Sequence, residues 1–170
     1  MTSNRKSKAK KGATMITITI PDGETFQLQH LVLDMNGTLT VDGSLPEGVS
    51  QRIEKLKNEM DIYLLTADTF GTGAKVAQEL GIKMFTVSSD NGTKDKADFV
   101  SSFELSEVVA VGNGNNDVEM FKLARLSIVV IGEEGCSIAT LTNADIAVTH
   151  INHALDLLIN PLRLIATLRR

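Results

Sequence analysis

Small polar side chains follow three apolar runs of the sequence, at the points where predicted strands end. They are Asp34, Asn36 and Thr38 after the first run, Thr66 and Asp68 after the second, and Asn113, Asn115, Asn116 and Asp117 after the third. Lys94 and Lys96 lie between the second and third groups. Carboxylate and amide oxygens suit a hard cation, whereas a hydroxyl and an ammonium suit phosphate oxygens. The pattern predicts a site for a cation and a phosphoryl group, with an aspartate as nucleophile through an aspartyl phosphate.

The segments between these positions alternate between strand and helix patterns. Strands are expected at 15–20, 25–34, 61–66, 83–88, 107–112, 126–131 and 145–149, and helices at 46–60, 71–80, 94–103 and 116–124. Alternation of this kind predicts a three-layer α/β/α, Rossmann-like fold with a parallel sheet, and the first two strands are expected to form an N-terminal β-hairpin. Ligands of such sheets bind outside the carboxyl ends of the strands, which is where the polar groups fall.

Length and composition favour one domain, since the chain has 170 residues and 42% of them are hydrophobic. We expect residues 15–170 to form it and residues 1–14 to be a disordered basic tail. The tail carries five of the basic residues and no acid, which leaves the rest of the chain at −9 when the total is −4. Without an apolar run of membrane-spanning length or a signal peptide, a cytoplasmic protein is predicted, with neither membrane nor nucleic acid as partner.

Four segments together resemble the haloacid dehalogenase-like superfamily, and within it the phosphorylation domain of P-type ATPases. They are DMNGTLT (34–40), LLTADTFGTGAKVAQELGI (64–82), KDKADFV (94–100) and AVGNGNNDVEMFKLARLSIVV (110–130). Each alone is a weak signal, but all four occur in family order at predicted strand ends. The resemblance extends over roughly residues 31–149.

The resemblance implies an Mg²⁺-dependent phosphohydrolase and assigns a role to each matching residue. Asp34 would be the phosphorylated nucleophile and Thr66 the phosphate-binding hydroxyl. Lys96 would be the ammonium that offsets the charge of the nucleophile and of the phosphate. Lys94 is the competitor for the last role. The residues expected to contact substrate are Thr38, Thr66, Ala67 and Lys96. The residues expected at the metal are Asp34, Asn36 through its backbone carbonyl, Asn113 and Asp117.

Two residues depart from the family pattern. Phosphatases of the superfamily carry an acid-base aspartate where this chain has Asn36, so proton transfer should lose ~10²–10⁴ in rate and the enzyme should be slow. Asn113 replaces an aspartate on Mg²⁺. The substitution removes a charge that is worth ~4 kcal/mol at ~4 Å and an effective dielectric near 20, before desolvation. A catalytically weak or inactive phosphate- or metal-binding module is therefore the alternative hypothesis.

Residues 41–60 leave no room for a cap or nucleotide-binding domain between the first motif and the next strand. An open site suits a phosphorylated macromolecule, or a phosphorylated small molecule covered by a neighbouring subunit of a homo-oligomer. A receiver domain also phosphorylates an aspartate, but its motif order differs. Asp68 has two interpretations of equal weight, as a site residue or as a helix cap. The leucines of 151–170 are expected to close the core.

Overall fold

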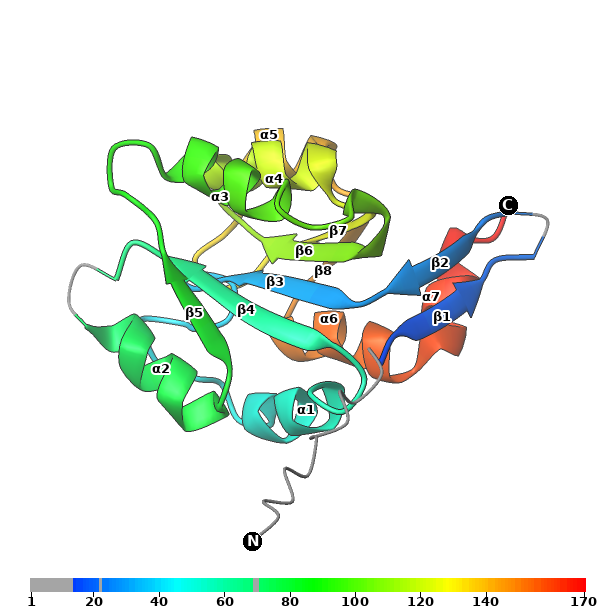
Figure 1. The fold of residues 1–170 in the computed structure, drawn as a ribbon, viewed down its shortest axis with the longest axis horizontal. Helices are drawn as coiled ribbons and strands as arrows, with labels where there is room; N and C mark the ends of the chain where they lie inside the picture. The colour runs from blue at the N-terminus through cyan, green and yellow to red at the C-terminus, as the bar shows by residue number, and fades with distance from the viewer. Residues whose placement is uncertain (1–13, 22, 69–70) are drawn as a thin grey trace, which may run out of the picture.

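The computed structural model describes residues 14–21, 23–68 and 71–170, and the expected tail falls almost entirely outside them. A six-stranded parallel sheet lies at the centre, in the order β5-β4-β3-β6-β7-β8 (Figure 1). Its strands are β3 (His30–Asp34), β4 (Asp61–Thr66), β5 (Lys83–Thr86), β6 (Val108–Gly112), β7 (Leu126–Val130) and β8 (Ile146–Val148). β6 and β7 are buried along their whole length, as expected for strands covered on both faces.

Helices cover both faces of this sheet and complete three layers, which confirms the predicted α/β class (Figure 1). One layer contains α3 (Gly92–Val100), α4 (Val118–Leu123) and α5 (Ile138–Thr142). The other contains α1 (Val49–Leu56), α2 (Thr72–Leu80) and α6 (Ile151–Ile159). α7 (Pro161–Leu168) follows α6 and packs against it and against the first strand of the N-terminal hairpin. Short 3₁₀ turns lie at Leu105–Glu107 and Asn115–Asp117. Leu155, Leu158 and Leu164 join the core, as the C-terminal leucine pattern predicts.

The predicted strand 25–34 is two strands. β1 (Ile16–Thr19) and β2 (Thr25–Leu28) form a separate antiparallel hairpin, and β3 begins after Gln29. The backbone N–H of Gln29 donates to Glu107 and its carbonyl accepts from Asp61, so this residue already bonds to the main sheet. Burial changes here from every second residue in β2 to nearly every residue in β3, and this marks the passage from one sheet to the other.

The chain reverses its direction across the sheet between β3 and β6. From β3 it runs outward through β4 to β5, and it then returns to the other side of β3, where β6, β7 and β8 follow in order. A crevice forms at the carboxyl ends of strands at such a switch point. Asp34 ends β3 and Asn113 follows β6, so the topology brings two of the four motifs together. Within the described residues, no helix has the length and apolarity needed to cross a membrane.

Candidate active site

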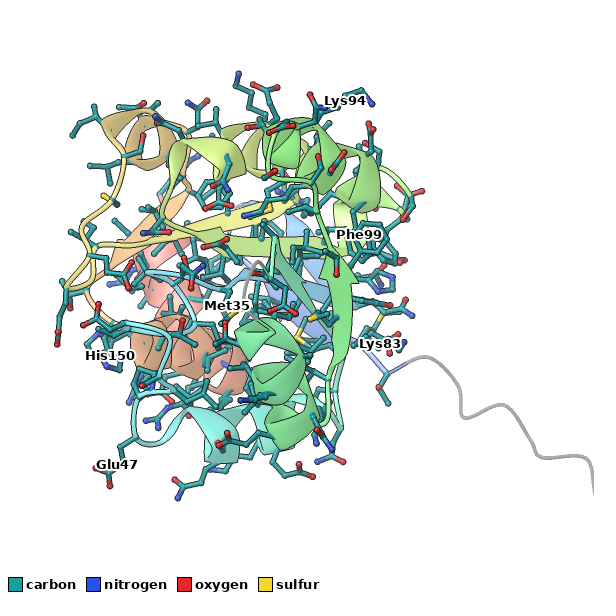
Figure 2. All side chains as sticks on the ribbon, turned by 90° about the vertical axis from the view of Figure 1, so that its left-hand side faces the viewer. Met35, Glu47, Lys83, Lys94, Phe99 and His150 are labelled. Atoms are coloured by element: carbon teal, nitrogen blue, oxygen red, sulfur yellow. The ribbon has the colours of Figure 1, made fainter. Side chains whose placement is uncertain are left out.

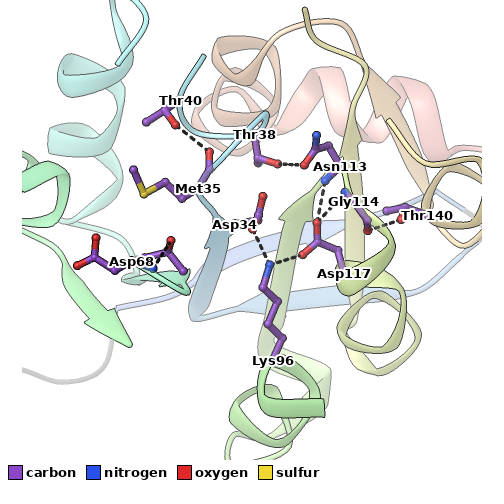
Figure 3. Close-up of polar contacts among 11 residues, drawn as sticks. Asp34, Met35, Thr38, Thr40, Asp68, Lys96, Asn113, Gly114, Asp117 and Thr140 are labelled. Atoms are coloured by element: carbon purple, nitrogen blue, oxygen red, sulfur yellow. Dashed lines mark hydrogen bonds and ion pairs between the residues drawn. The ribbon is translucent and has the colours of Figure 1, made fainter. Parts of the chain in front are cut away.

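Asp34, Lys96 and Asp117 form a buried ion triad at this switch point (Figure 3). Lys96 Nζ donates to Asp34 Oδ1 at 2.5 Å and to Asp117 Oδ1 at 2.7 Å. The lysine and Asp117 are at most 1% exposed, and Asp34 is 8% exposed. Charges removed from water in this way are tolerated when they are paired and hydrogen-bonded, as all three are here.

The triad changes the acidity of two of its members. Burial and the neighbouring charge of Asp117 raise the pKa of Asp34 to about 6, and the Lys96 ammonium limits the rise. Burial acts to lower the pKa of Lys96, but the two carboxylates outweigh it, and that pKa lies above its ordinary value. Lys96 therefore stays cationic at neutral pH, and Asp34 is predominantly a carboxylate there.

Asp117 also fixes the turn after β6. Its Oδ2 accepts from the backbone N–H of Asn113 at 2.9 Å and of Gly114 at 3.0 Å. A Cβ atom on Gly112 would collide with this carboxyl group, so the close approach requires glycine at 112. With Lys96 on its other oxygen, Asp117 connects the lysine to the loop that carries Asn113.

Asn113 joins two loops at the edge of the site. Its Oδ1 accepts from the Thr38 hydroxyl at 3.1 Å, and its Nδ2 donates to the Gly135 carbonyl at 3.2 Å. Gly37 lies in the left-handed region with φ of 73°, and a Cβ atom there would strike the Asn113 side chain. Glu134 adds a contact that sequence patterns do not predict, since its Oε1 accepts from the backbone N–H of Asp42 at 3.0 Å.

Thr66 ends β4 with its hydroxyl at the site. Its Oγ1 accepts from the backbone N–H of Asp68 at 3.2 Å, which leaves the hydroxyl proton available to a ligand. Asp68 itself accepts from the N–H groups of Gly73 and Ala74, in the first turn of α2, and does not line the cavity. Of its two interpretations, the structure therefore favours the helix cap.

A cavity of about 390 Å³ opens above the triad. The predicted site residues among its lining are Asp34, Asn36, Thr66, Ala67, Lys96 and Asn113. Thr38 and Asp117 lie behind this wall, where they hold Asn113 and Lys96. Lys94 is exposed at the outer surface and pairs with Asp98 (Figure 2). It therefore does not take the place of Lys96 beside Asp34.

A segment outside the four sequence motifs supplies another part of the cavity wall. Ser88, Ser89, Asp90 and Thr93 line the cavity from the loop between β5 and α3 and from the start of that helix. Asn116 adds a further polar group. Its position is the signal that the sequence offers, since SDNGT (89–93) follows directly on the strand predicted at 83–88 and contains only small residues, most of them polar.

The donor set fits a hard divalent cation, although its charge is low. Asp34, Asn36 and Asn113 line the cavity and all carry oxygen atoms, the ligand atom that Mg²⁺ prefers. Within the described ranges, no three histidine, cysteine or acidic side chains gather closely enough to hold a metal by themselves. Such a site depends on amide and backbone oxygens.

Comparisons with known proteins agree with this geometry. A family model for haloacid dehalogenase-like hydrolases matches residues 100–145. An uncharacterized protein of Methanocaldococcus jannaschii, MJ0073, is 52% identical over 63 residues, which are 37% of this chain and 68% of that protein. The copper-transporting ATPase of Saccharomyces cerevisiae is 33% identical over 160 residues, which are 91% of this chain and 15% of the ATPase.

Two solved structures share the fold. The cobalt-bound deoxy-D-mannose-octulosonate 8-phosphate phosphatase of Haemophilus influenzae superimposes with a TM-score of 0.68 at 15% identity, and 84% of this chain and 94% of that chain are covered. The 3-deoxy-D-manno-octulosonate 8-phosphate phosphatase of Moraxella catarrhalis, in complex with magnesium, phosphate and KDO, gives a TM-score of 0.61 at 18% identity, with the same coverage. With its four motifs in order on this fold, the chain belongs to the haloacid dehalogenase-like hydrolase superfamily.

Proposed function

We propose that the protein is a slow, Mg²⁺-dependent phosphohydrolase that acts through an aspartyl phosphate on Asp34. One observation carries the proposal: Asp34 ends β3, borders the cavity and lies 2.5 Å from the buried Lys96 ammonium. A carboxylate in this position can attack a phosphorus atom while the lysine offsets the negative charge that gathers.

Asp34, the Asn36 carbonyl and Asn113 would hold the cation, and Asp117 would add its charge from below. Bound there, Mg²⁺ would supply positive charge to the phosphoryl oxygens. The Thr38 hydroxyl, which now donates to Asn113, would turn away to free that amide oxygen. Magnesium and cobalt in the related phosphatases support the choice of a divalent cation.

The chain's own residues account for two half-reactions. In the first, an Asp34 oxygen attacks phosphorus, the bond to the ester oxygen breaks, and the leaving alkoxide takes a proton from water. In the second, water attacks the phosphorus of the aspartyl phosphate, inorganic phosphate leaves, and the Asp34 carboxylate returns. The Thr66 hydroxyl donates to a phosphoryl oxygen in both. Asn36 exchanges no proton near neutral pH, so both steps lack general acid-base assistance.

Asn36 and Asn113 also favour a second candidate, a phosphate- or metal-binding module without turnover. An assay with p-nitrophenyl phosphate over a range of Mg²⁺ concentrations separates the two. The enzyme hypothesis predicts slow, Mg²⁺-dependent release of nitrophenol that Asp34→Asn abolishes. If turnover is absent, or persists in Asp34→Asn, the proposed enzyme is wrong. Saturable binding of phosphate without turnover would support the module.

A further inference from the structure

Asp90 places a negative charge on the wall of the cavity that the proposed chemistry does not use. Its side chain is exposed, and it accepts one hydrogen bond, from the Ser89 hydroxyl at 3.3 Å. Within 14–21, 23–68 and 71–170, the charged side chains that line the cavity are Asp34, Asp90 and Lys96. Asp90 is therefore the carboxylate of the cavity lining that a bound ester can meet besides Asp34.

The loop that carries Asp90 is held in place by hydrogen bonds. Asp95, in the first turn of α3, accepts from both the backbone N–H and the hydroxyl of Ser88, each at 2.7 Å. The Ser88 hydroxyl in turn accepts from the backbone N–H of Asn91 at 3.1 Å. These contacts on both sides of Asp90 fix the backbone from which its carboxylate extends.

Among the residues that the structure describes, the cavity wall offers no spare cation for a second anionic group. Lys96 already bonds to Asp34 and Asp117. Lys94 pairs with Asp98 and does not line the cavity, and Figure 2 shows it at the outer surface. The other polar side chains of the described lining are neutral and come from serine, threonine and asparagine.

From this arrangement we propose that the site selects phosphate monoesters with a cationic or neutral leaving group, and disfavours esters that carry a second anion. Asp90 is the residue that sets this preference. The inference rests on the proposed function and names its substrate class. A carboxylate or a polyphosphate on the substrate would meet the Asp90 charge, whereas an ammonium would be attracted to it and hydroxyls would bond to the neutral wall.

Three esters of equal carbon number test the inference: phosphoethanolamine, 2-hydroxyethyl phosphate and phosphoglycolate. Their leaving groups are cationic, neutral and anionic. With saturating Mg²⁺ and low salt, kcat/KM should fall in that order, by about threefold to tenfold for each unit of charge, and added salt should narrow the differences. Equal values for the three esters would overturn the inference and leave the proposed phosphohydrolase intact.

Charge variants identify the residue responsible. Asp90→Asn should reduce the ratio of kcat/KM for phosphoethanolamine to that for phosphoglycolate, and Asp90→Lys should reverse the preference. 2-Hydroxyethyl phosphate, whose leaving group is neutral, reports the change that is common to all three esters through their phosphoryl group. Glu59→Gln and Glu59→Lys make the same charge changes at an exposed residue near the opposite ends of the strands, and should leave the order unchanged. An order unaffected by Asp90→Lys, or equally affected by Glu59→Lys, contradicts the assignment.

A complete lack of turnover would end the proposed function but not this test. Calorimetry with the wild-type protein, Mg²⁺ and each ester then gives three dissociation constants. Affinities in the order cationic, neutral, anionic support the charge selection. Equal affinities, or no binding of any ester, overturn it.

Discussion

Lys96 Nζ and Asp34 Oδ1 lie 2.5 Å apart, although the two residues are 62 positions apart in the chain. The parallel sheet and the α3 helix bring them together, and Asp117 completes the charge balance on the other side of the lysine. A buried ammonium between two carboxylates is stable only as a set, because removing one member leaves the others buried without compensation.

Lys96→Met should therefore destabilise the protein strongly. The variant leaves Asp34 and Asp117 facing each other, and we expect the free energy of unfolding to fall by about 3–5 kcal/mol, as measured by urea denaturation at pH 7.5. Lys94→Met, two positions away, removes an exposed charge paired only with Asp98 and should change stability little. Similar effects of both substitutions would show that the buried triad does not support the fold.

Asn36→Asp should raise turnover. Asn36 is exposed at the cavity wall, and a carboxyl group there could give a proton to the leaving group and take one from water. We expect kcat for p-nitrophenyl phosphate to rise by about tenfold to hundredfold, with a new acid limb in the pH profile. Asn116→Asp puts the same charge on another part of the wall and should produce neither change. An unchanged kcat in Asn36→Asp would mean that proton transfer does not limit the reaction.

Asn113→Asp should strengthen Mg²⁺ binding and lower the stability of the metal-free protein. The added charge should lower the dissociation constant of Mg²⁺ by at least about tenfold in calorimetry. Without metal, the new carboxylate faces the Gly135 carbonyl that Asn113 Nδ2 now bonds at 3.2 Å, which should cost about 1–3 kcal/mol of stability. Asn115→Asp, two positions away, is the control and should leave Mg²⁺ affinity near that of wild type. Equal Mg²⁺ affinities in all three proteins would exclude Asn113 as a ligand.

The raised pKa of Asp34 predicts a pH dependence of the stability of the metal-free protein and another of kcat/KM. Because it is raised from 3.8 to about 6, the folded metal-free protein holds a proton between these values that the unfolded chain releases. The contribution of Asp34 to stability therefore falls as pH rises through this interval. At limiting Mg²⁺, kcat/KM should fall as pH drops below about 6, because the nucleophile must be ionised. The Asp34 carboxyl carbon, followed by NMR in metal-free protein, should titrate near 6, and a midpoint near 3.8 would contradict both.

The sequence predicts the layers, the parallel sheet and the neighbourhood of Asp34, because periodicity and strand ends are local properties and parallel strands share one carboxyl edge. The prediction of one strand over 25–34 was wrong at Gln29. The strand-like pattern is unbroken there, but the chain passes from the hairpin to the main sheet because Gln29 bonds to Glu107 and Asp61. The residue type of Asp68 could not show whether it is a site residue or a helix cap. Its carboxylate bonds to backbone groups that come near it only in the folded loop.

Two features could not be predicted for a related reason: the part of the cavity wall that carries Asp90, and the hydrogen bond from Asp42 to Glu134. Both depend on how loops fold over the end of the sheet, and loop conformation follows from side-chain hydrogen bonds such as those of Asp95 to Ser88. No periodic pattern records these bonds.

Mass spectrometry after reaction with acetyl phosphate tests the central claim most directly. The protein is incubated with Mg²⁺, quenched in acid, digested, and the peptide containing Asp34 is sequenced. We predict one acid-stable phosphoryl group on Asp34, absent without Mg²⁺ and absent in Asp34→Asn. A phosphoryl group on another residue, or hydrolysis that continues at the wild-type rate in Asp34→Asn, would contradict the account.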